Sequence, residues 1–141
     1  MKKMLLSLTL ATMMPLGGAL ASDATPSAPD AEVYFISPTD GATVTNPITV
    51  RFGLKGMGIA PAGTERENTG HHHLLINTDI PPLDENIPMD DQHVHFGGGQ
   101  TETTIKLAPG QHTLQLLLGD MYHLPHDPAV FSQKITITVT E

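Results

Sequence analysis

The sequence contains no cysteine and no tryptophan, and the two absences exclude several kinds of protein. Without cysteine, no disulfide can hold the fold together, no lipid can be attached to a lipoprotein, and no thiolate can serve as nucleophile or metal ligand. Stability must therefore come from core packing, to which a bound metal ion could add. Any metal site in this chain has to be built from nitrogen and oxygen ligands, with thioether as the remaining soft donor.

Basic residues are also scarce. Seven lysines and arginines stand against fifteen acidic residues, which gives a formal net charge of −8. Nucleic acids and anionic membranes are bound through basic patches, so we expect neither as a partner. The acidic balance is compatible with attraction of cations, and equally with simple solubility.

The apolar run near the N-terminus, residues 4–16, is shorter than the roughly 20 residues that a membrane-spanning helix needs. Lys2 and Lys3 precede it, and small residues follow it in an ALA sequence that ends at Ala21. This pattern predicts a signal peptide over residues 1–21 that is cleaved after Ala21. We therefore expect a periplasmic or secreted protein with no membrane span after cleavage.

The chain after residue 21 reads as β-structure, and thirteen glycines and twelve prolines punctuate the whole sequence. Apolar and polar residues alternate, as in half-buried strands, and no segment has a sustained helical period. The expected strands cover residues 32–36, 47–54, 71–77, 101–107, 111–118 and 133–140. The pattern predicts an all-β, antiparallel immunoglobulin-like β-sandwich of about seven strands, over a single domain of residues 32–141. Residues 22–31 are small, polar and proline-containing, which predicts a flexible linker.

Two connections are too long for a minimal sandwich, residues 55–70 and residues 78–92. Loops of this length are usually functional or disordered. The second contains five acidic residues, Asp79, Asp84, Glu85, Asp90 and Asp91, and four large apolar ones, Ile80, Leu83, Ile87 and Met89. We expect this second loop to pack down as an ordered flap beside the histidines.

Histidine is what the sequence has in excess. Seven of its eight histidines fall in three clusters, His71-His72-His73, His93-Val94-His95 and His123-Leu124-Pro125-His126. Imidazole binds Zn, Cu, Ni and Fe ions well. Positions i and i+2 of a strand share a face, so His71 and His73 point together, as do His93 and His95. If those two strands are neighbours, four imidazoles could converge on one ion.

The candidate metal ligands are therefore His71, His73, His93, His95, His123 and His126. We expect His72 to point the other way, with Leu74 and Ile76, and His112 to be structural as well. The Gly97-Gly98-Gly99 run that follows His95 is typical of a strand-end bulge or of a close approach of the backbone.

Nitrogen and oxygen ligation favours Cu(II) or Zn(II), and Met57, Met89 and Met121 are either thioether ligands for Cu(I) or core residues. A non-enzymatic binding module for such an ion is the leading hypothesis. Because a metal needs neutral imidazole, its affinity is expected to fall as the pH drops through about 6.5.

Two alternatives remain open. In the first, an adhesion or ligand-binding domain uses the histidines as a structural network around a cleft for a small ligand or a protein, with no metal. In the second, a small cupin-like metal-dependent enzyme uses His93, His95, Glu102 and His112, although their spacing departs from the cupin pattern. In that enzyme, Glu102 or Asp120 would be the acid or base.

Four segments carry a family resemblance: FISPTDGATVTNPITVRFGLKGMGIAPAG, NTGHHHLLIN, HVHFGGGQTET and GQHTLQLLLGDMYHLPHDP. Together they resemble the bacterial exported family known as domain of unknown function 4399, over about Val33 to Val139. The resemblance implies export and a compact β-rich domain. It also implies that the histidine segments, with Asn68, Gly70 and Gly97 to Gly99, belong to the family's defining pattern. No activity follows from it.

Overall fold

The computed structural model describes residues 24–141, so the expected signal peptide over residues 1–21 lies outside the described residues. Within residues 24–141 the chain forms strands and loops without a helix, and hence without a helix able to cross a membrane. The strands are β1 (Glu32–Ser37), β2 (Thr43–Thr45), β3 (Ile48–Lys55), β4 (Gly58–Ile59), β5 (Thr69–Ile76), β6 (His93–His95), β7 (Glu102–Ile105), β8 (Gly110–Gly119) and β9 (Ile135–Thr140).

These strands form two sheets. One has three strands in the order β1-β3-β7, all antiparallel. The other has the order β2-β9-β8-β5-β4, and β6 also pairs with β5. The all-β prediction is confirmed. The purely antiparallel arrangement is wrong for two pairs, because β2 runs parallel to β9 and β4 runs parallel to β5. Both extra strands are two or three residues long, too short for an alternating pattern to reveal them.

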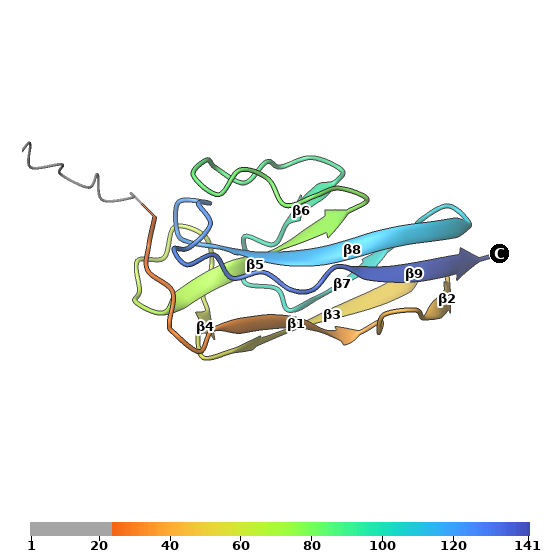
Figure 1. The fold of residues 1–141 in the computed structure, drawn as a ribbon, viewed down its shortest axis with the longest axis horizontal. Coiled ribbons are helices and arrows are strands. Elements are labelled where there is room, and N and C mark those ends of the chain that lie inside the picture. The colour runs from red at the N-terminus through yellow and green to blue at the C-terminus, as the bar shows by residue number, and fades with distance from the viewer. Residues whose placement is uncertain (1–23) are drawn as a thin grey trace, which may run out of the picture.

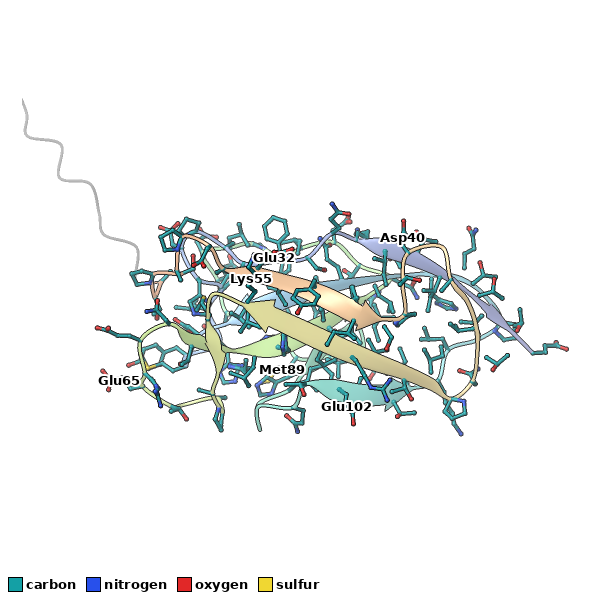
Figure 2. All side chains as sticks on the ribbon, turned by 90° about the horizontal axis from the view of Figure 1, so that it is seen from below. Glu32, Asp40, Lys55, Glu65, Met89 and Glu102 are labelled. Carbon is teal, nitrogen blue, oxygen red and sulfur yellow. The ribbon has the colours of Figure 1, made fainter. Side chains whose placement is uncertain are left out.

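The main core lies between the sheets, and the alternation seen in the sequence places its residues there. Every second residue of β3, β5, β8 and β9 contributes, including Val50, Phe52, Leu74, Leu116 and Ile137. Figure 1 shows β1 and β3 on one side of this core and β5, β8 and β9 on the other. On the rim, Glu32 and Lys55 lie side by side on β1 and β3, with the amine 3.9 Å from the carboxylate (Figure 2). Such an exposed pair adds little stability.

The six-stranded sheet is covered on its outer face as well. Residues 77–92, here called the flap, connect β5 to β6 and lie on the side of the sheet away from β1 and β3 (Figure 1). Ile80 and Ile87 of the flap pack against Leu75 of β5 and Leu117 of β8 in a second, smaller core. Leu83 and Met89 stay exposed. Strands β5 and β8 are therefore buried on both faces, which explains their continuous apolar runs.

The N-terminal segment makes specific contacts from Thr25 onward. The Thr25 hydroxyl donates to Asp120 over 2.7 Å. Backbone hydrogen bonds join Ser27 to Asp127 and Asp127 to Thr25. Composition predicted a flexible linker here, but these bonds attach residues 25–27 to the loop that follows β8.

His72 points into the main core, as its place in β5 predicts. It is fully buried, and its ring lies 5.1 Å from that of Phe52. Among the described residues neither of its ring nitrogens has a hydrogen-bond partner. Loss of solvation by burial lowers its pKa to about 4. The native state therefore holds His72 neutral, whereas the unfolded chain takes up a proton near pH 6.5.

His72→Leu is expected to stabilise the metal-free protein more at pH 4.5 than at pH 7.5. As the pH falls from 6.5 towards 4, the unfolded wild-type chain binds a proton at His72 that the native state does not. The free energy of unfolding of wild type thus falls by up to about 3 kcal/mol, at about 1.4 kcal/mol per pKa unit, and that of the leucine variant does not. Denaturant unfolding in the presence of chelator measures this difference at both pH values. His72→Gln, polar but without this titration, separates charge from polarity. An equal His72→Leu effect at both values would contradict the assignment.

Candidate metal centre

Three histidines of the outer face are brought together by strand pairing. His71 and His73 project from β5 on the side opposite His72, because side chains alternate along a strand. Strand β6 pairs antiparallel with β5, with His95 directly opposite His73. Residues directly opposite share a face, so His95 joins the two β5 imidazoles. The two strands are therefore neighbours, which from the sequence was the condition for the histidines to converge.

The fourth ring comes from the other end of the sequence. The loop that follows β8, residues 120–128, brings His123 over the same patch. The His123 ring lies 5.0 Å from that of His71 and 4.6 Å from that of His95, centroid to centroid. Nitrogens of His71, His95 and His123 lie within 4.8 Å of one another. The His73 ring completes the group at 4.8 Å from His71 and 5.1 Å from His95. These four residues are called the histidine cluster.

The inner half of the cluster has no hydrogen-bond partners. His71 and His73 are completely buried, and within residues 24–141 neither ring nitrogen of either residue is bonded. The outer half is half-exposed, and Nε2 of His95 lies 2.9 Å from Nε2 of His123. A buried polar group without a partner costs about 1–3 kcal/mol. The cluster thus keeps several nitrogen lone pairs available inside the protein.

Three rings of the cluster have lowered pKa values, which favours the neutral state that metal binding needs. Burial, and then the neighbouring His123 and His95, lower the pKa of His71 to about 4, although nearby Asp120 opposes this shift. Burial, and then His71, lower the pKa of His73 to about 2. The pKa of His95 is also lowered, by burial and by His123. Protonation of these three rings therefore competes with metal binding only at a pH lower than 6.5. From the sequence, we expected that competition to begin near pH 6.5.

Two glycines make room for the rings. A Cβ on Gly97 would lie 2.4 Å from Cε1 of His95, and one on Gly119 would lie 2.7 Å from Cε1 of His73. Side-chain carbons never approach so closely, so both positions require glycine for space. Gly97 begins the triple-glycine run, and its role is close approach of a ring to the backbone. Packing against the backbone therefore helps to orient both imidazoles, and among the described residues it acts on His73 without help from a ring hydrogen bond.

A buried carboxylate shapes the loop that carries His123. Asp120 is 1% exposed, and its Oδ1 accepts hydrogen bonds from the amides of Tyr122 and Leu124. Its Oδ2 accepts from the hydroxyl of Thr25. These bonds fix a tight turn around His123, whose φ of 67° lies in the sparsely occupied left-handed region.

Hydrogen bonds also join the flap to the loop of residues 120–128, which carries His123. The amide of Ile87 donates to the carbonyl of His123 over 2.8 Å, and the side-chain amide of Asn86 donates to the carbonyl of Tyr122 over 2.7 Å. Because Ile87 is anchored in the second core, the position of His123 is tied to that core. The prediction of an ordered flap beside the histidines agrees with this arrangement.

Two of the six predicted ligands lie outside the cluster. His93 shares the face of His95, but its Nδ1 is 2.8 Å from the carboxylate of Asp90. His126 is buried, and its Nε2 donates to the carbonyl of Thr69 over 3.1 Å. A Cβ on Gly70 would lie 2.8 Å from the His126 ring, so this histidine is packed against the backbone.

The residues expected to act in the cupin-like enzyme, and the methionines expected as thioether ligands, do not gather at one site. Glu102 lies on β7 of the three-stranded sheet and pairs with Arg51 over 3.0 Å. His112 donates to the carbonyl of Ala108 and accepts from Asn77, which fits the structural role expected for it. Met57 packs against the main core, whereas Met89 is exposed. A cleft of about 380 Å³ beside residues 83–84 and 124–129 has His126 as its lining histidine.

The family profile described as Domain of unknown function (DUF4399) matches residues 50–140, so the chain belongs to this family. The match includes all four histidines of the cluster and both glycines that make room for them. No curated protein and no solved structure shows significant similarity to the chain.

Ring resonances of His71 and His73 in the metal-free protein are expected to stay at their neutral positions from pH 7.5 to pH 5. Burial and the neighbouring imidazoles hold both pKa values at or below about 4. Long-range proton–nitrogen NMR spectra measure this directly. The urea-unfolded chain is the control, since its histidines should titrate near pH 6.5. An inflection near 6.5 for either ring in the native protein would disprove the assignment.

Proposed function

We propose that this protein is a non-enzymatic binding module for a transition metal ion, copper or zinc. His71, His73, His95 and His123 would be its ligands. The observation that carries the proposal is the gathering of four imidazoles, three of which have nitrogens within 4.8 Å of one another, while the ring nitrogens of His71 and His73 have no partners among residues 24–141. One metal ion would satisfy one nitrogen of each ring, with Zn–N distances of about 2.0–2.1 Å.

The other histidines of the chain support this interpretation by contrast. A structural histidine bonds to a carboxylate, a carbonyl or an amide, and His93, His112 and His126 each do so. Among residues 24–141 His72 also lacks such bonds, but its ring packs against Phe52 in the main core. The cluster combines missing partners with close imidazole neighbours, and a shared metal ion accounts for both features.

Electrostatics also favours a cation. Gathering four imidazoles would be unfavourable if they were protonated, and burial together with mutual repulsion keeps His71 and His73 neutral. Asp120 lies close enough to His71 to raise its pKa and thus supplies negative charge beside the cluster. Five further acidic residues lie in the flap. Together they produce a potential that attracts a metal ion.

We also propose that the protein acts after export and that its fold is an immunoglobulin-like sandwich. The lysine pair, the apolar run and the ALA sequence at the N-terminus support export. The strand orders β1-β3-β7 and β9-β8-β5-β6 correspond to the A-B-E and G-F-C-C′ orders of immunoglobulin domains. The parallel β2 beside β9 then corresponds to a first strand that is divided between the two sheets.

Removal of one outer ligand should abolish tight metal binding. His95→Ala and His123→Ala are expected to weaken Zn(II) or Cu binding by more than about 100-fold, because even outer-shell partners of metal ligands contribute 10–100-fold. Both residues are half-exposed, so the variants should still fold, which circular dichroism checks. His93→Ala is the matched control from the same strand. Calorimetric titration with each metal decides, and similar affinities in all four proteins would contradict the proposal.

A second test uses the triple glycine. Gly97→Ala should weaken metal binding at least about tenfold, because its Cβ displaces the His95 ring. Gly98→Ala is the control, since its Cβ meets only the flexible end of Gln100, 3.1 Å away. That substitution should change affinity by no more than about twofold. The prediction fails if the two alanines have the same effect on the measured dissociation constant.

A further inference from the structure

Five of the six distances between the rings of the histidine cluster are nearly equal. Five of the centroid separations fall between 4.6 and 5.1 Å. The sixth, from His73 to His123, is 6.2 Å. The pair opposite to it, His71 and His95, is separated by 5.0 Å. Six equal separations define a tetrahedron, so the four rings approach that shape but are elongated along the edge from His73 to His123.

Tetrahedral and square coordination of one metal ion predict different distances between the ring centroids. With a metal–nitrogen bond of about 2.0–2.1 Å, each ring centroid lies about 3.2 Å from the ion. Four rings at the corners of a tetrahedron are then all about 5.2 Å apart. In a square they are about 4.5 Å apart along the sides and about 6.4 Å along both diagonals. The 5.0 Å between His71 and His95 is incompatible with a diagonal.

The fold resists conversion to a square. His71 and His73 are fixed on β5, and His95 is fixed opposite His73 by the pairing of β6 with β5. His123 is held by the Asp120 turn and by its bond to Ile87. Moving His71 and His95 to opposite corners would require them to separate by more than 1 Å within one sheet. With all four imidazoles as ligands the coordination would be complete, which is typical of structural or carrier sites rather than catalytic ones.

We infer that the cluster is a closed, tetrahedral site for a metal ion with a filled d shell, Zn(II) or Cu(I). This inference rests on the proposed function. Zn(II) has no geometric preference of its own and accepts a tetrahedron, whereas Cu(II) prefers a tetragonal or square arrangement. Because all four ligands are imidazoles and soft sulfur favours Cu(I), Zn(II) is the expected occupant.

Co(II) is the probe for the geometry, since it replaces Zn(II) and its visible absorption depends on coordination. A tetrahedral site lacks a centre of symmetry, so bound Co(II) should absorb at least about tenfold more strongly than six-coordinate aqueous Co(II). One equivalent of Zn(II) should abolish the band. His93→Ala should keep it, and His123→Ala should lose or shift it. Competition with a Zn(II) chelator and with a Cu(I) chelator, in separate arms, ranks the two ions.

The outcomes separate the two levels of the proposal. An intense Co(II) band that Zn(II) displaces supports the tetrahedral site. Tight metal binding with weak, six-coordinate Co(II) absorption and a square-planar Cu(II) resonance spectrum overturns the tetrahedral inference and leaves the metal-binding function standing. Failure of Zn(II), Cu(I), Cu(II) and Co(II) to bind the folded protein overturns both.

Discussion

Strand β5 is buried on both faces, and the rest of the structure is arranged around that constraint. Because side chains alternate between the two faces of a strand, the three consecutive histidines of β5 lie in two environments. His72 enters the apolar space between the sheets, while His71 and His73 enter the space under the flap. Pairing with β8 on one edge and with β6 on the other fixes β5 in place. The buried environment of His71 and His73 could not exist if the outer face of this strand were open to water.

Closing that outer face depends on contacts distant in sequence. Ile80 and Ile87 of the flap contribute apolar surface over Leu75 and Leu117. Asp120 organises the loop that brings His123 to the patch, and the Ile87 amide joins the two covering segments. Burial then keeps the imidazoles neutral and their nitrogens without partners, which is unfavourable for the metal-free protein. The same features favour a bound cation, so stability and the proposed function are linked through one set of residues.

Much of the fold could be predicted because it depends on local alternation. The six longer strands, the inward direction of His72 and the common face of His71 and His73 follow from a period of two, whereas the pairing of His73 with His95 comes from the structure. The short parallel strands β2 and β4 could not be predicted, since two or three residues carry no periodicity. Four of the six proposed ligands lie in the cluster. His93 and His126 lie outside it and form hydrogen bonds with Asp90 and with the carbonyl of Thr69. The spacing of histidines in the sequence does not show which of them have such partners.

The sequence by itself determined that any metal site would lack thiolate ligands, because it contains no cysteine, and that His71 and His73 share one face of a strand. It also supplied the glycines, although it did not show which rings they accommodate. Only the tertiary structure decided that His123 completes the cluster, because that contact joins residues about fifty apart through loop packing. It also decided the near-tetrahedral spacing, which depends on how two paired strands and one turn are placed in space. Alternation is a local property of the backbone, whereas convergence on one point is not.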